Sequence, residues 1–147
     1  MTSPGIRPTG TTDGPGVTEP VGSGVWLVRA FWDRIQARDW ARVAELLAPE
    51  VVLDWPVSRE RVVGAANLVA VNAEYPEGWA IRVLRVIGHG PDVASEVDVT
   101  MPDAPASRSA AFWTVADGRI TSGVEYWSTV GADPAPPWRA PYTTRLD

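Results

Sequence analysis

The segment Asp117–Ser128, with the sequence DGRITSGVEYWS, places one carboxylate, Glu125, among apolar and aromatic neighbours. Its first two residues are typical of a tight turn, and the remainder is typical of a strand. If Glu125 lies inside the protein, the loss of water disfavours its charged form and raises its pKa toward the range useful in general acid–base catalysis. The alternative is a structural ion pair with an arginine of a neighbouring strand. The candidate partners are Arg82, Arg85 and Arg108.

Two further groups of polar residues could take part in chemistry. Asn72 could donate a hydrogen bond to a substrate carbonyl and stabilise an enolate, or it could instead cap a loop inside the core. Glu96 and Asp98 alternate with valines, so they share one face of a strand. They could form an acid–base pair, although such a face is more often the solvated outside of an antiparallel sheet.

The residue types also exclude several kinds of site. The chain has no cysteine, which rules out disulfides, zinc–thiolate sites and thiol nucleophiles. The single histidine, His89, lies in the turn-like sequence GHGPD and cannot form a histidine metal cluster. No P-loop, dinucleotide-binding fingerprint, HExxH sequence or nucleophile elbow is present. We therefore expect chemistry that needs no cofactor and no metal.

Composition and charge indicate which classes of binding partner the protein is expected to have. The net charge of −5 and the absence of basic runs disfavour a nucleic-acid partner, because binding phosphates requires clustered basic residues. The first residues lack the pattern of a signal peptide, and no apolar run is long enough to cross a membrane. We expect a cytoplasmic protein. The eight tryptophans exceed what a core of this size needs, which favours a large, flat, hydrophobic ligand.

Three helices are predicted in the first half of the chain, over residues 25–38, 40–48 and 65–75. In the first helix, apolar residues recur at spacings of three and four, which places them on one face. Asp39 is a favourable N-cap for the second helix, and Pro49 is expected to end it. In the third helix one face carries Leu68, Val71, Asn72 and Tyr75.

One strand is predicted before the third helix, and four are predicted after it. One strand is predicted over 51–56, entering an irregular loop that contains Arg59 and Arg61. Four more strands, joined by short turns, are predicted over 79–88, 93–101, 109–115 and 119–128. This order predicts an α+β fold in which three helices cover a mainly antiparallel sheet. Residues 1–24 are expected to form a disordered leader, and residues 131–147 a proline-rich extended tail.

The chain resembles the nuclear transport factor 2-like superfamily, in particular its SnoaL-like polyketide cyclase and ketosteroid isomerase-like branches. The resemblance covers residues 25–130 and is carried by FWDRIQARDWARVAELLAPEVVLDWP, GAANLVAVNAEYP and ADGRITSGVEYW. It implies a cone-shaped domain in which a curved sheet and three helices enclose a pocket. It also implies a homodimer that forms through the outer face of the sheet.

The resemblance implies roles for individual residues. Phe31 takes the position of the oxyanion-binding tyrosine of the isomerases, and Trp55 takes that of their aspartate base, so steroid isomerisation by that route is not expected. Glu125 takes the position of the catalytic aspartate of the SnoaL-like cyclases. The residues expected to be catalytic are Glu125 and Asn72. Those expected to contact the substrate are Phe31, Trp55, Tyr75, Trp113 and Trp127.

We therefore expect a cofactor-independent enzyme acting on a small, hydrophobic, carbonyl-bearing molecule of polyketide or terpenoid type. Cyclisation, isomerisation, dehydration and epoxide opening all remain open. The alternative is a non-catalytic ligand-binding or dimerisation domain of the same fold. A buried Glu125 without an arginine favours the enzyme, whereas a Glu125–arginine pair favours the binding domain. The tail, with Trp138 and Tyr142, either docks on a partner subunit or covers the edge of its own sheet.

Overall fold

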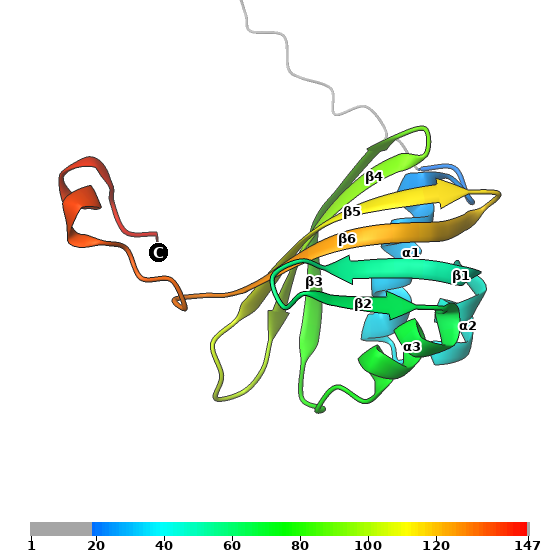
Figure 1. Ribbon diagram of the computed structural model, residues 1–147, viewed down its shortest axis with the longest axis horizontal. Coiled ribbons are helices and arrows are strands. Elements are labelled where there is room, and N and C mark those ends of the chain that lie inside the picture. Colours follow the sequence, from blue (N-terminus) through cyan, green and yellow to red (C-terminus); the bar gives the residue numbers. More distant parts are fainter. Residues whose placement is uncertain (1–18, 147) are drawn as a thin grey trace, which may run out of the picture.

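The computed structural model describes residues 19–146 (Figure 1). Most of the predicted leader therefore lies outside the described residues. The helices are α1 (Gly24–Gln36), α2 (Trp40–Glu45) and α3 (Ala65–Ala73), and a short 3₁₀ helix, η1, spans Pro137–Tyr142. The strands are β1 (Leu47–Trp55), β2 (Glu60–Val63), β3 (Ala80–His89), β4 (Asp92–Thr100), β5 (Ser107–Ala116) and β6 (Arg119–Thr129).

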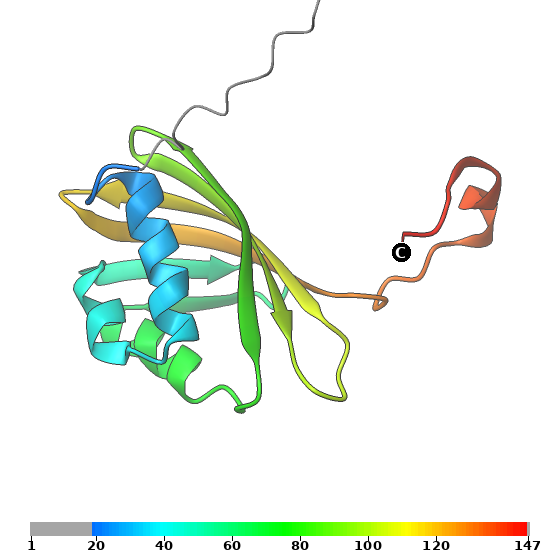
Figure 2. The ribbon, with the colours of Figure 1, turned by 180° about the vertical axis from the view of Figure 1, so that it is seen from behind.

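The six strands form one sheet in the order β2-β1-β6-β5-β4-β3. Every neighbouring pair is antiparallel except β1 and β6, which run parallel. The turn between β5 and β6 contains Asp117 and Gly118, both with positive φ, as a tight hairpin requires. Figure 1 shows that the open sheet is strongly curved, and Figure 2 shows α1 lying across its concave side. This arrangement confirms the predicted α+β fold.

The concave side of the sheet and the buried face of α1 form the core. Phe31 and Trp32 of α1 pack against Trp113 of β5, with ring centroids 5.2 Å and 6.1 Å from that of Trp113. Gly123 of β6 makes room for Trp113, because a Cβ atom at this position would lie 2.6 Å from the indole ring. The glycine on β6 therefore allows the large side chain of Trp113 to pack at the centre of the sheet.

The polypeptide around Pro49 differs from the prediction. Helix α2 ends at Glu45, and strand β1 already begins at Leu47, so Pro49 lies within a strand and does not simply end a helix. The pairing of β1 with β6 is interrupted between Leu47 and Val52. A proline is tolerated there because no residue between Leu47 and Val52 is in register with a residue of β2 or β6.

Two other segments differ from their predictions. The expected loop with Arg59 and Arg61 contains the edge strand β2, in which Arg61 lies opposite Asp54 of β1. The sequence ERVV lacks the alternating apolar pattern of a strand, because exposed edge strands commonly carry charged residues. The tail contains η1, with Pro137 in its first turn, and is therefore not extended throughout. Figures 1 and 2 show that the tail projects away from the sheet.

None of the helices in the described part of the chain is long and apolar enough to span a membrane. The predicted boundaries of the folded domain at residues 25 and 130 remain predictions. The described elements nevertheless fall between α1 and β6, apart from η1. The curved sheet and the helices on its concave side therefore form the framework that positions the candidate site.

Candidate functional site

A cavity of about 400 Å³ lies among α1, α3 and the concave side of the sheet. Its volume is in the range typical of small-molecule sites, about 300–1,000 Å³. Most of the surrounding side chains are apolar or aromatic. The residues that line it are Trp32, Ile35, Trp55, Val57, Ser58, Val71, Asn72, Tyr75, Trp79, Ile81, Val99, Ser107, Glu125 and Trp127.

Glu125 lies at the wall of this cavity and is only 3% exposed. Alternation along β6 turns Glu125 to the concave side, whereas its neighbours Val124 and Tyr126 point to the outer face. The indole Nε1 of Trp55 donates a hydrogen bond to Oε2 of Glu125 at 2.8 Å. The hydroxyl of Ser109 donates to Oε1 at 2.7 Å. Both carboxylate oxygens are thus held by neutral donors.

Burial raises the pKa of Glu125 above its ordinary value. Hydrogen bonds from Ser109, Trp55 and Trp127 act in the opposite direction, because they stabilise the charged form, but their combined effect is smaller. The shifted carboxyl group can therefore exchange a proton with a ligand closer to neutral pH than an exposed glutamate can.

The arginines considered as partners of Glu125 pair with other carboxylates. Arg82 and Arg108 both contact Asp98, at 2.8 Å and 3.1 Å, and Arg85 pairs with Glu96. These groups come from β3, β4 and β5 and lie on the outer face of the sheet. Within residues 19–146 no arginine forms an ion pair with Glu125. The structural ion-pair hypothesis for Glu125 is therefore not supported.

The predicted pair Glu96 and Asp98 lies on the outer face together with these arginines. Each carboxylate already has an arginine partner, and neither is among the residues that line the cavity. The interpretation of this face as the outside of the sheet agrees with the structure.

Four of the predicted site residues come together at the cavity: Trp55, Asn72, Tyr75 and Trp127 line it with Glu125. The side-chain Nδ2 of Asn72 donates a hydrogen bond to the carbonyl of Leu68 at 2.9 Å. An amide nitrogen carries two hydrogens, so one donor of Asn72 is left for a ligand. Tyr75 is half exposed, as expected for a residue at the rim.

Phe31 and Trp113 do not lie where the prediction placed them. Both are buried in the core beside Trp32, and neither is among the residues that line the cavity. The indole of Trp113 donates to the hydroxyl of Ser95 at 2.8 Å, which turns its polar edge away from Glu125. On α1 it is Trp32 and Ile35 that reach the cavity, because Trp32 points to a different side of the helix from Phe31 and Ile35 lies one turn further along it.

The sequence analysis missed other residues that build the site. Ser107 lines the cavity and Ser109 contacts Glu125, both from the concave side of β5. Their alternation with Arg108 was a usable signal, because two small polar residues on the buried face of a strand require partners. Trp32 and Trp79, which are not among the predicted site residues, are buried and also line the cavity.

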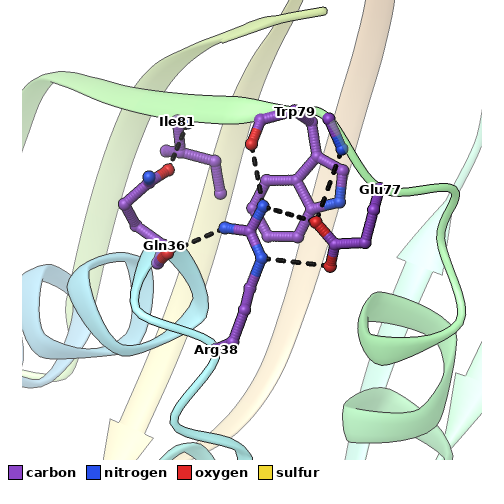
Figure 3. Close-up of polar contacts among 6 residues, drawn as sticks. Gln36, Arg38, Glu77, Trp79 and Ile81 are labelled. Carbon is purple, nitrogen blue, oxygen red and sulfur yellow. Dashed lines mark hydrogen bonds and ion pairs between the residues drawn. The ribbon is translucent and has the colours of Figure 1, made fainter.

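Arg38 contacts Trp79, one of the residues that line the cavity (Figure 3). Its guanidinium carbon lies 3.3 Å from the ring centroid of Trp79, and two of its nitrogens donate to the Glu77 carboxylate at 3.2 Å and 3.0 Å. It also donates to the backbone carbonyls of Gln36 and Trp79. Arg38 has a φ of 60°, a conformation that costs energy in a non-glycine residue, and these contacts compensate for it.

The arrangement offers little to a metal ion. In the part of the chain that the structure describes, no group of three or more potential ligands from His, Cys, Asp and Glu gathers at one point. What the cavity does offer is one carboxyl group of shifted pKa, several hydroxyl and amide groups, and aromatic walls that displace water. This set suits proton transfer to or from a small molecule.

Comparisons with known proteins agree with this fold. The sequence model of the SnoaL-like domain family matches residues 28–123. A protein from Kribbella flavida DSM 17836, provisionally assigned as a ketosteroid isomerase, is 31% identical, with a TM-score of 0.76 over 82% of this chain and 87% of its own. A comparison with curated proteins gave no match.

Two more distant structures share the fold. An NTF2-like protein of unknown function from Burkholderia xenovorans LB400 is 21% identical, with a TM-score of 0.68 over 82% of this chain and 93% of its own. An LEH-like epoxide hydrolase of M. tuberculosis is 21% identical, with a TM-score of 0.61 over 71% of this chain and 81% of its own. With its helices, curved sheet and matching sequence, the chain belongs to the SnoaL-like domain family of NTF2-like proteins.

Proposed function

We propose that this protein is a cofactor-independent enzyme that uses Glu125 as a general acid or base on a small, hydrophobic, carbonyl-bearing molecule. The observation that carries the proposal is the position of Glu125, which is buried at the wall of the cavity with neutral hydrogen-bond donors and no arginine partner among the described residues. A group of this kind is costly to bury, so a role in proton transfer gives it a reason to be there.

The cavity suggests how such a reaction would proceed. Glu125 would take a proton from a carbon next to the substrate carbonyl; the electron pair of the broken C–H bond would form the C=C bond of the enolate as the C=O π pair moves to the oxygen. The free N–H of Asn72 would hydrogen-bond that oxygen and stabilise the enolate. Glu125 would then return the proton at another position. The aromatic walls, including Trp55 and Trp127, would exclude water.

Proton exchange at carbon tests the proposal without knowledge of the natural substrate. 2-Tetralone, a bicyclic ketone with acidic C–H groups, is incubated with the protein in D₂O, and deuterium incorporation is followed by NMR. We expect Glu125→Gln to lower the enzyme-dependent exchange rate at least about 100-fold, since a positioned general base contributes about 10²–10⁴-fold.

The matched control is Glu96→Gln, the same chemical change on the outer face of the same sheet. This variant should exchange 2-tetralone at the wild-type rate. If wild type and Glu125→Gln exchange equally fast, the acid–base proposal fails. The alternative, a non-catalytic binding domain, would then account better for the cavity.

The proposal includes a homodimer formed through the outer face of the sheet. Ile87, Phe112 and Tyr126 are exposed there, and charged pairs such as Arg61–Asp54 lie beside them. A second copy would offer the same apolar centre and the same pairs of opposite charge. Sedimentation equilibrium should show a dimer for the wild type and a monomer for Phe112→Asp. A wild-type monomer at all concentrations would remove the dimer from the proposal.

A further inference from the structure

Within residues 19–146, the lining of the cavity contains one acidic residue and no basic residue. Its lining contains no arginine or histidine among the described residues, and Glu125 is its one carboxylate. Four of the eight tryptophans line it, and Tyr75 lies at its rim. The face of an aromatic ring carries partial negative charge. An anionic ligand would therefore meet a carboxyl group and aromatic faces with no positive group to offset them.

The groups around Glu125 are suited to an ionised carboxylate. An indole N–H can only donate a hydrogen bond, so the side chain of Trp55 requires Oε2 of Glu125 to be an acceptor. Trp127 adds a donor of the same kind, and Ser109 donates to the other oxygen. Burial works against the same ionised state. The site therefore satisfies the hydrogen-bonding needs of an anion and withholds the positive charge that would balance it.

A positively charged ligand would supply what the site lacks. We propose that the cavity binds a hydrophobic organic cation, a tertiary or quaternary amine whose charged nitrogen lies against Glu125 and the indole rings of Trp55 and Trp127. Aromatic side chains attract such cations through their ring faces, most strongly when water is excluded. The net charge of −5 adds a general attraction for cations.

The protein already places a cation against an aromatic ring at Trp79. The guanidinium of Arg38 lies over the ring of Trp79, and its charge is balanced by Glu77 (Figure 3). Arg38 is not among the residues that line the cavity. An aromatic ring and a carboxylate thus hold a cation at the outer side of the cavity wall, and the cavity itself offers the same two groups without a cation.

This inference rests on the proposed function in that the ligand occupies the same cavity, and it names the class of that ligand. It also selects among the reactions. A bound cation keeps Glu125 ionised, so the reaction would begin with Glu125 as a base that removes a proton from carbon. Cyclisation, isomerisation and dehydration through an enolate begin in this way, whereas acid-assisted epoxide opening requires a protonated Glu125.

Two probes of the same shape and different charge test the inference on the full-length protein. Phenyltrimethylammonium and tert-butylbenzene differ only in the exchange of a positively charged nitrogen for a carbon. Their dissociation constants are measured by the change in tryptophan fluorescence. We expect wild type to bind the cation at least about tenfold more tightly than the neutral probe, which is about 1.4 kcal/mol.

Two variants test whether Glu125 is responsible for the preference for the cationic probe. In Glu125→Gln the affinity for phenyltrimethylammonium should fall about tenfold or more, and the affinity for tert-butylbenzene should stay within about twofold. Glu96→Gln should leave both affinities unchanged. Equal or tighter binding of the neutral probe by wild type overturns the inference, and this comparison does not depend on whether any variant folds. The exchange of 2-tetralone is measured separately. Failure of the cation inference therefore does not decide whether Glu125 acts as an acid or base.

Discussion

The two faces of the sheet treat carboxylates in opposite ways. On the outer face Asp54, Glu96 and Asp98 each pair with arginine; solvent reaches Asp54 and Glu96, whereas Asp98 is buried beside Arg82 and Arg108. On the concave face Glu125 is buried and held only by neutral donors. The outer pairs keep the sheet soluble at little cost, whereas the inner carboxylate is costly to bury. This lack of a charged partner is the reason that we propose a functional role for Glu125.

The largest contrast between the faces should appear in stability. Trp113→Ala removes a side chain buried on the concave face against Phe31 and Gly123, and should lower the free energy of unfolding by about 3–5 kcal/mol. Its neighbour Phe112 is 59% exposed on the outer face of the single chain, so at protein concentrations too low for the proposed dimer Phe112→Ala should change the free energy of unfolding by no more than about 0.5 kcal/mol. Denaturation in guanidinium measures both. A large loss for Phe112→Ala that depends on protein concentration would show that a second chain covers the outer face.

The next effect is a dependence of stability on pH that comes from Glu125. Its pKa is raised in the folded protein, so its contribution is fully present below the pKa of the unfolded chain, about 4.5, and is lost as pH rises through the folded pKa. Wild type should lose up to about 1.4 kcal/mol per pH unit in this interval relative to Glu125→Gln. Urea denaturation of both proteins from pH 4.5 to 8 measures the difference. Parallel curves would mean that Glu125 titrates like an exposed glutamate.

A smaller effect is expected at Asp98, which joins three strands on the outer face. Asp98→Asn removes the charge that Arg82 and Arg108 share and should lower the free energy of unfolding by about 1 kcal/mol. Both arginines are exposed but Asp98 is buried, so 1 M salt should remove only part of this difference. A loss that salt does not change would indicate that packing around Asp98 matters more than its charge.

The smallest effect is expected at Asp54, which pairs with Arg61 between β1 and β2. The hydrogen bonds from Arg61 lower the pKa of Asp54, so the pair stabilises the protein above the unfolded pKa and stops doing so as pH falls through the lower, folded value. This sign is opposite to that of Glu125. NMR titration of Asp54 in wild type and in Arg61→Gln should show a higher pKa in the variant. An unchanged pKa would contradict the role assigned to Arg61.

Much of the framework could be predicted from the sequence. Helix α1 followed from apolar spacing, and the hairpin of β5 and β6 followed from its turn residues, because these signals are local. Strand β2 could not be predicted, since three of its four residues are exposed and the segment is a strand only because β1 pairs with it. The strand that passes through Pro49 depends on a break in pairing with β6, which is also not local.

The site shows the same division. The family resemblance placed Glu125 at the pocket, and helical spacing placed Asn72 and Tyr75 on one helix face; all three residues line the cavity. Depth could not be predicted, because alternation tells which face a residue occupies and not how far along the sheet the cavity extends. This is why the prediction failed for Phe31 and Trp113: both were expected to contact the ligand, and both lie in the packed core.

The parallel pairing of β1 with β6 has a consequence for how the protein folds. It places Trp55 beside Glu125, although 70 positions separate them in the sequence. Contacts between such distant segments are slow to form, because a long loop must close first. The cavity should therefore be completed only after the last strand is added. The fluorescence of Trp55 would then report the final step of folding, and a chain that ends before β6 would have helices but no site.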